Sequence, residues 1–259
     1  LSNWSWDFDA DAIADDNNQN PTYTFPSTGA FPVNLSIVDT NGCTHDTIIT
    51  VDVSPKPVAE FSFTNECFGS ATGFTDLSTT PSGTITSWTW DFNNNNVVDN
   101  ITQNPSNGYP SAGTYDAELL VTNSFGCIDS TILQIVVNPI PIANFGTSSS
   151  CLGLVTVFTD SSTVTTGNIT SWSWDFGDAT GASILQNPTY TYAAAGNYNV
   201  TLTVTSDSGC IHTFNTDVDI FPNPTAAFTT NDVCLNVLAS FTDNSNGNGD
   251  VINDWAWDF

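Results

Sequence analysis

The sequence predicts an all-β protein, an array of small β-sandwich domains in tandem. The motif Trp-x-Trp-Asp-Phe occurs four times, with its first Trp at positions 4, 88, 172 and 255. The intervals of 84, 84 and 83 residues are longer than a solenoid repeat and match one small domain each. Apolar and polar residues alternate in short runs, which Asn, Gly, Pro and Asp clusters separate, and no segment shows a 3.6-residue period.

The individual elements are expected to be half-buried strands. In residues 198–205, Tyr198, Val200, Leu202 and Val204 share one face, and polar residues occupy the other. The motif strand places both of its tryptophans and its Phe on a single face in the same way. Two sheets packed through such faces give a sandwich of roughly 80 residues, an ordinary size for this architecture.

Proline-rich joints divide the array into domains. The sequence Pro-x-Pro occurs at 55–57, 139–141 and 222–224, and each ring restricts the backbone to an extended form. We therefore expect the C-terminal part of a repeat in residues 1–55, complete repeats in 56–138 and 139–222, and the N-terminal part of a repeat in 223–259. This pattern also predicts that the chain is a segment of a longer polypeptide.

The composition is strongly acidic, and this limits the partners. Lys56 is the single basic residue against 27 acidic ones, and the formal charge is −26. Such a surface repels nucleic acid and anionic lipid, and no apolar run is long enough to cross a bilayer. We therefore expect no nucleic-acid partner and no membrane insertion in this segment. The hydrophobic content of 39% is high enough for a folded core.

Three separated motifs resemble those of the PKD domain family. They are Trp-Ser-Trp-Asp-Phe-Gly-Asp at 172–178, Asn-Pro-Thr-Tyr-Thr-Tyr at 187–192, and the strand 196–205. The repeat at 56–138 departs from the family pattern, because Asn93–Asn96 replaces Gly-Asp-Gly and Asn107 replaces the first Tyr. The resemblance covers the whole chain, as two complete repeats between two partial ones.

The resemblance implies an immunoglobulin-like sandwich that acts as an extracellular spacer or adhesive module. The cysteine decoration is similar to that of long surface adhesins of gliding or biofilm-forming Bacteroidetes, which are exported and often glycosylated. Asp46-Thr-Ile and Asp129-Ser-Thr resemble a short O-glycan acceptor motif of that group, so Thr47 and Ser130 are weak glycosylation candidates. Unmodified side chains are the simpler alternative in a chain so rich in threonine.

Six cysteines recur with the repeat. Cys43, Cys127 and Cys210 each follow a Gly in a turn between strands, whereas Cys67, Cys151 and Cys234 lie near the start of the next repeat. Periodic cysteines in an exported chain favour disulfides over catalytic thiols, and the absence of a C-x-x-C motif argues against zinc.

The pairing of the cysteines is left open between three patterns. In an immunoglobulin-like sandwich the two cysteine positions lie at opposite ends, so a head-to-tail array favours an inter-repeat Cys67–Cys210 staple, with Cys43, Cys127, Cys151 and Cys234 paired to other repeats. Intradomain pairing predicts Cys67–Cys127 and Cys151–Cys210. Sequential pairing predicts Cys43–Cys67, Cys127–Cys151 and Cys210–Cys234, and free thiols are a further alternative.

Oxygen-bearing side chains alternate in the loop after the motif strand. The candidate ligands are Asp7, Asp9, Asp11 and Asp15 in one loop, and Asp91, Asn93, Asn95 and Asp99 in the next. This spacing suits calcium, which takes six to eight oxygens, although no bidentate Glu closes the loop. The alternative is a set of Asx turns, in which these side chains bond to their own backbone. No other cofactor is expected.

The second Trp of each motif is expected in the core, which gives Trp6, Trp90, Trp174 and Trp257. The first Trp lies nearer the strand end and is the better candidate for stacking on a sugar. His45 and His212 occupy equivalent positions two residues after a cysteine, where we expect solvated side chains.

Catalysis has little support, because the chain has two histidines, one lysine and no arginine to activate a nucleophile or hold an anion. We therefore expect no enzymatic activity. The sequence favours a structural shaft of an extracellular adhesin or surface filament, in which neighbouring repeats are the main partners. The alternatives are a module that binds surface polysaccharide or other adhesin chains, and an accessory spacer of a secreted hydrolase.

Overall fold

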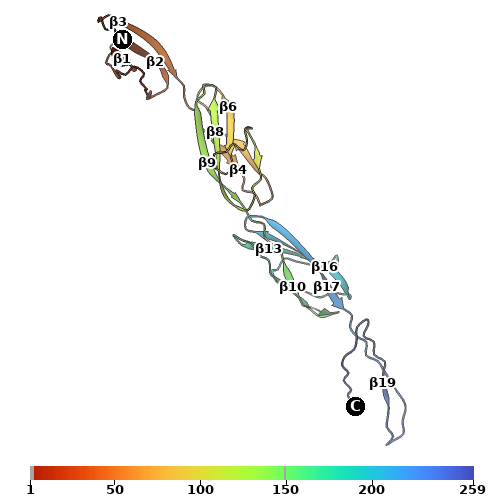
Figure 1. The fold of residues 1–259 in the computed structure, drawn as a ribbon. Coiled ribbons are helices and arrows are strands. Elements are labelled where there is room, and N and C mark those ends of the chain that lie inside the picture. Colours follow the sequence, from red (N-terminus) through yellow and green to blue (C-terminus); the bar gives the residue numbers. More distant parts are fainter. Residues whose placement is uncertain (1–2, 149) are drawn as a thin grey trace. The chain divides into compact units, whose positions relative to one another are not determined.

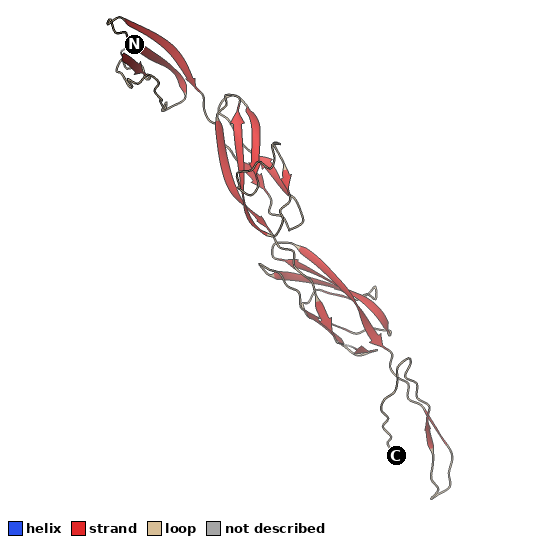
Figure 2. Ribbon diagram, in the orientation of Figure 1, coloured by secondary structure: helices blue, strands red, loops and turns tan. Residues whose placement is uncertain are grey.

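The computed structural model describes residues 3–148 and 150–259, and all of its regular elements are strands (Figures 1 and 2). Within these ranges no helix exists that could cross a lipid bilayer. The chain divides into two compact units, one formed by Leu1–Pro110 with Thr114–Val137 and the other by Ser111–Gly113 with Asn138–Phe259. The all-β prediction is confirmed.

The first unit opens with a single antiparallel sheet. It contains β1 (Asn3–Asp7), β2 (Gly29–Val38) and β3 (Thr44–Val53) in the order β1-β2-β3. The register places Trp6 opposite Leu35, so both side chains point to the same face. Residues 3–53 form no second sheet to cover this face, and Trp6 is only partly buried.

The following repeat is a two-sheet sandwich. One sheet has the order β4-β5-β7, from β4 (Phe61–Phe63), β5 (Thr72–Asp76) and β7 (Ser106–Asn107). The other has the order β6-β8-β9, from β6 (Ile85–Asp91), β8 (Gly113–Asn123) and β9 (Ile128–Val137). Both sheets contribute to one core, in which Trp90, Leu119 and Ile135 have no exposed surface.

The second unit contains a sandwich of the same design. One sheet has the order β10-β12-β15, from β10 (Phe145–Thr147), β12 (Thr156–Asp160) and β15 (Thr189–Tyr190). The other has the order β11-β17-β16-β13-β14, from β11 (Ser150–Cys151), β13 (Ile169–Asp175), β14 (Ala182–Ser183), β16 (Gly196–Ser206) and β17 (Ile211–Phe221). The core again centres on a buried tryptophan, Trp174.

The C-terminal residues form half of this architecture. Residues 222–259 contain only the two-stranded sheet β18-β19, from β18 (Phe228–Thr230) and β19 (Phe241–Asp243). Trp257 packs on Phe228 and Phe241 but stays 41% exposed, because this segment has no second sheet to cover it. Trp90 and Trp174, which lie in the complete repeats, are 0% and 1% exposed.

Candidate functional site

The loop after β1 is organised by carboxylates that accept backbone N–H groups. Asp7 Oδ1 accepts from Ala10 at 2.7 Å and Asp7 Oδ2 accepts from Ala12 at 3.0 Å. The Phe8 N–H donates to Asp15 Oδ2 at 2.7 Å, which closes the loop. Ala10 and Ala12 have φ values of 61° and 67°, in the left-handed region where Asx-type loops turn the chain.

Three of the four predicted ligands in this loop come together. Asp7, Asp9 and Asp15 offer oxygens that all lie within 4.8 Å of one another, close enough for one metal ion to contact all three. Asp11 is not a member of this group, and its Oδ1 accepts the Ile13 N–H at 2.7 Å. Exposed acidic groups of this kind are common in proteins that bind no metal.

The loop after β6 has the same hydrogen bonds with fewer charges. Asp91 accepts the N–H groups of Asn93, Asn95 and Asn96, and the Phe92 N–H donates to Asp99 Oδ2 at 2.7 Å. Burial alone would raise the pKa of Asp91, but these backbone donors outweigh burial and lower it. The geometry therefore forms with neutral Asn93 and Asn95 where the first loop has carboxylates.

The loop after β13 is built differently. Asp178 Oδ2 accepts the Tyr190 hydroxyl at 2.5 Å, and Oδ1 accepts the N–H groups of Gly181 and Thr180 at 2.7 and 3.0 Å. The Tyr190 hydroxyl is the main cause, and the backbone donors a further one, of an Asp178 pKa of about 2. Tyr190 in turn stacks on Phe176 with ring centroids 4.3 Å apart. The Asp178 carboxylate therefore holds Tyr190 in place against the core.

The low pKa of Asp178 predicts a contribution to stability that is present above the ordinary pKa of 3.8 and is lost as the pH falls toward 2. We expect Asp178→Asn to lower the melting temperature of this repeat by at most about 4 °C at pH 7, because the carboxylate is only partly buried and solvent screens its interactions. Melts followed by circular dichroism between pH 2 and 7 test this. The melting temperatures of the wild type and the Asp178→Asn variant should converge near pH 2, and a constant difference at all pH values would contradict the prediction.

The cysteines fall into two chemical states. Cys67 and Cys210 are each disulfide-bonded, whereas Cys43, Cys127, Cys151 and Cys234 are free thiols. The intradomain and sequential pairings each require at least one of these free thiols in every predicted bond, so neither pattern is present. The turn that carries Cys127 is held by Asn123, whose Oδ1 accepts the Cys127 N–H at 3.0 Å.

Asn123 also joins that turn to the proline-rich joint. It is 1% exposed, and its Nδ2 donates to the Pro55 carbonyl at 2.9 Å. Cys127 Sγ lies 3.7 Å from the Ser54 carbonyl oxygen in the same region. Within this repeat, the turn and the start of the domain are therefore fixed to each other by a buried side chain.

Sequence reasoning missed an aspartate that binds the first Trp of the motif. The Trp88 Nε1–H donates to Asp76 Oδ2 at 2.7 Å, and Trp172 makes the same bond to Asp160 at 2.8 Å. Gln103 donates to Asp76 Oδ2 as well, at 3.1 Å. The signal was present, because Phe-Thr-Asp recurs at 74–76, 158–160 and 241–243 and Gln-Asn-Pro at 19–21, 103–105 and 186–188.

His212 is a structural acceptor rather than a solvated side chain. Its Nδ1 accepts the Ala143 N–H at 3.0 Å, and Asp129 Oδ2 accepts the Ala59 N–H at 2.9 Å in the same way. These residues hold the segments that lead into β4 and β10, the first strands of the two complete repeats. Thr47 on β3 and Ser130 on β9, the glycosylation candidates, are both exposed.

Comparison with known proteins identifies the repeat. The sequence model of the PKD domain matches residues 54–137 and 138–220. The pre-pro-metalloprotease PrtV of Vibrio cholerae is 42% identical over 72 residues, which are 28% of this chain and 8% of that protein. The chain therefore spans only a small part of this relative's length.

Two solved domains are similar in sequence. The PKD1 domain of Vibrio anguillarum Epp is 32% identical, with a TM-score of 0.30, and the match covers 32% of this chain and 95% of that domain. The PKD1 domain of the Vibrio cholerae metalloprotease PrtV is 36% identical, with a TM-score of 0.29, and the match covers 31% of this chain and 96% of that domain.

Proposed function

Because the chain belongs to the PKD domain family, we propose that it is a non-enzymatic shaft or spacer of a long extracellular adhesin or surface filament. One observation carries this proposal: the two complete repeats keep their inward positions and change their outward ones. Leu119 and Leu202 are equivalent and both 0% exposed, as are Val121 and Val204. A spacer needs a constant core, whereas a repeated binding or catalytic module would also keep its surface residues.

The outward positions of the same strands differ in character. On β8 and β9, Leu120 and Ile132 occupy positions where β16 and β17 have Thr203 and Asn215. The loops after the motif strand differ as well. The loop after β1 carries several carboxylates, the loop after β6 carries side-chain amides in their place, and the loop after β13 has a carboxylate bonded to a tyrosine. PKD and immunoglobulin-like domains are typically non-catalytic, which agrees with the lack of a repeated nucleophile and base in this sequence.

The environment we propose is the cell surface or extracellular space, as part of a longer chain of the gliding or biofilm adhesin type. PKD domains occur in secreted proteins, as in the PrtV relative, and a disulfide fits an oxidising compartment. The acidic surface suits a polymer that must stay soluble and must not associate with its neighbours.

We further propose that Cys67 and Cys210 form a covalent tie between consecutive repeats, which stiffens the shaft. A non-reducing peptide map with an Asp-directed protease tests this pairing. A Cys67–Cys210 peptide supports a tied array, whereas a peptide that joins either cysteine to another chain would overturn it. Free thiols throughout in protein secreted to the cell exterior would contradict the extracellular assignment itself.

The alternative function is a binding module or an accessory spacer of a secreted hydrolase, which the PrtV similarity favours. A pull-down of the 259-residue protein on immobilised surface polysaccharides separates these from a pure spacer. If the chain is only a shaft, the immobilised polysaccharide should retain no more of it than of a serum albumin control. Saturable binding, lost in Trp88→Phe and Trp172→Phe variants, would establish the binding module instead.

Calcium binding by the first loop is a separate proposal, supported by the grouping of Asp7, Asp9 and Asp15. We expect calcium titration calorimetry to show one site, weakened at least tenfold by Asp9→Asn because a ligand charge is lost. Asp11→Asn is the matched control, since Asp11 lies outside the group, and it should bind nearly as the wild type does. Absence of heat at millimolar calcium would leave the Asx-turn interpretation in place.

A further inference from the structure

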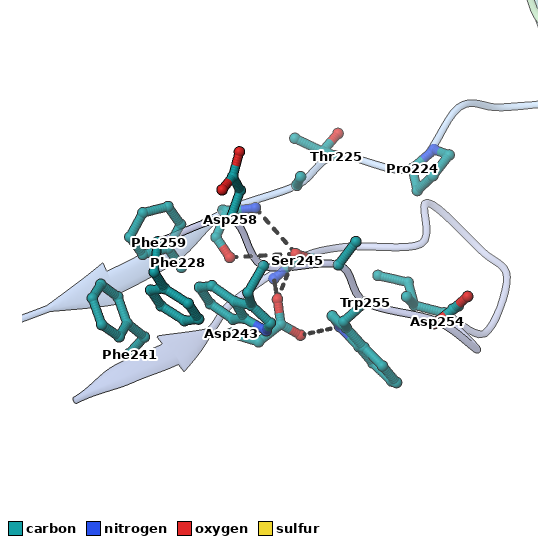
Figure 3. Close-up of a pocket in the computed structure, with 15 residues that line it drawn as sticks. Pro224, Thr225, Phe228, Phe241, Asp243, Ser245, Asp254, Trp255, Asp258 and Phe259 are labelled. Atoms are coloured by element: carbon teal, nitrogen blue, oxygen red, sulfur yellow. Dashed lines mark hydrogen bonds between the residues drawn. The ribbon is translucent and has the colours of Figure 1, made fainter. Parts of the chain in front are cut away.

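The two complete repeats share their internal bonds but differ at one edge of a sheet. The indole that bonds an aspartate in both complete repeats does so again in the C-terminal segment, where Trp255 Nε1–H donates to Asp243 at 2.8 Å (Figure 3). The last long strands, β9 and β17, are equivalent in sequence position. Strand β9 ends the sheet β6-β8-β9, whereas β17 has the short strand β11 paired to its C-terminal end.

The middle of β9 has an open backbone edge. The Val136 N–H points away from β8, because it donates to Asn65 Oδ1 at 3.0 Å. Alternate residues of a strand direct their backbone groups to the same side, so Ser130, Ile132 and Gln134 share this direction. Within the part of the chain that the structure describes, no backbone group pairs with these three residues on that side. Their N–H and C=O groups are therefore available to another strand.

Two side-chain bonds mark the ends of this open stretch. Asp129 Oδ2 accepts the Ala59 N–H at 2.9 Å at one end, and the bond from Val136 to Asn65 lies at the other. Residues 130–134 lie between them, and Ile132 is at their centre. An identical strand can therefore pair with this stretch in the antiparallel direction, with Ile132 opposite its own copy.

The side chains of the stretch suit such a pairing. Residues 130–137 read Ser-Thr-Ile-Leu-Gln-Ile-Val-Val, with no charge, no Gly and no Pro, in a chain with 27 acidic residues. Uncharged runs rich in β-branched residues are those that pair through an exposed edge. Ile132 is 49% exposed, and Leu133, on the opposite face of the strand, is 36% exposed. A second strand here would bury apolar surface without bringing carboxylates together.

The equivalent strand in the other complete repeat is protected. Asp217 and Asp219 on β17 occupy the positions of Gln134 and Val136. The Asp217 carboxylate is held on the surface of the sheet, where it accepts Asn199 Nδ2–H at 2.9 Å. Charged side chains on an edge strand oppose pairing with a second strand, so β17 is closed to the contact that β9 allows.

We propose that two copies of this chain associate side by side through antiparallel pairing of β9 with β9, with Ile132 of one copy opposite Ile132 of the other. The occupant must be an uncharged strand with an open stretch of matching length, and β9 of a second copy meets both conditions. The contact is two-fold symmetric, so it closes as a dimer. The acidic surface elsewhere keeps the copies apart and restricts pairing to this edge. Lateral pairing is a property beyond the proposed shaft function.

Sedimentation velocity of the 259-residue protein at about 1 to 500 μM, with its free thiols alkylated, tests the proposal. We expect a reversible monomer–dimer equilibrium that tightens with added NaCl, because salt screens the repulsion between two acidic copies. Ile132→Asp should weaken the dimer at least tenfold, since it places two carboxylates opposite each other. Ile132 is half exposed, so the change spares the core. Asn215→Asp, at the equivalent position on β17, is the matched control and should associate as the wild type does.

A mixing experiment tests the register. Ile132→Asp and Ile132→Lys should each associate more weakly alone than in an equimolar mixture, because the mixture places opposite charges across the contact. The proposal is overturned by a wild type that stays monomeric at about 500 μM, by an Ile132→Asp protein that associates as the wild type does, or by a mixture no more associated than its components. The shaft proposal would survive each of these outcomes, because it depends on the constant cores of the repeats.

Discussion

Trp174→Ala should unfold the complete repeat of the second unit or leave it barely stable. The indole is 1% exposed, packs edge-on against Phe145 at 5.0 Å, and donates its Nε1–H to the Leu185 carbonyl at 2.9 Å. Replacing a buried Trp by Ala costs about 3–5 kcal/mol, and the unpartnered Leu185 carbonyl adds to this. A domain of this size has a total stability of roughly 5–10 kcal/mol.

Hydrogen exchange followed by mass spectrometry in the full chain measures this effect repeat by repeat. Peptides from β13 and β16 should exchange about 1,000-fold faster in the variant, which corresponds to a loss of about 4 kcal/mol. Peptides from β6 and β8 should keep their wild-type rates. Trp255→Ala, at a position 51% exposed, is the matched control and should change exchange by less than about tenfold. Protection in β13 that survives Trp174→Ala would show that the core does not depend on this indole.

Gly177→Ala adds one methyl group and should strongly destabilise the complete repeat of the second unit. Gly177 has a φ of +80°, and an added Cβ would lie 2.5 Å from the Asn199 carbonyl oxygen on the neighbouring strand β16. Because the obstacle is backbone, it cannot move without disturbing the β13–β16 pairing. The left-handed conformation costs Ala about 1–2 kcal/mol by itself, and we expect a total of about 3 kcal/mol.

Gly209→Ala separates the cost of the left-handed backbone conformation from the cost of the close approach to a neighbouring strand. Gly209 has the same φ of +80°, but nothing lies within 4 Å of its added Cβ. This control should lose only the conformational share, about 1–2 kcal/mol. Urea unfolding of the two variants, with exchange in β13 as the local probe, gives the comparison. Equal losses in both variants would mean that the approach of Asn199 has no energetic consequence.

The predicted fold depended on local patterns, and these held. Alternation of apolar residues in 198–205 placed Val200 and Leu202 inward, and both are fully buried. The motif spacing located Trp90 and Trp174 in equivalent cores for the same reason, since a strand with one apolar face must bury it. In residues 222–259, Trp257 packs on Phe228 and Phe241 in the same way, with ring centroids 5.4 and 5.8 Å apart.

The candidate sites, in contrast, depend on the folded loops and not on the spacing of residues in the sequence. The loop spacing pointed to Asp7, Asp9, Asp11 and Asp15, but only the folded loop separates Asp11 from the other three. Asp91 was expected to serve as a ligand, and its carboxylate is occupied by three backbone donors. Alternating acidic residues do not show whether their oxygens point to a cation or to the chain itself.

The sequence by itself determined the repeat period, the strand faces and the acidic surface, because each depends on residues close together in the chain. Only the tertiary structure decided that Trp88 bonds Asp76, that His212 holds Ala143, and which cysteines are oxidised. The partners in these two hydrogen bonds are 12 and 69 residues apart. Side-chain chemistry alone allows many such pairs, and the pairing of strands selects among them.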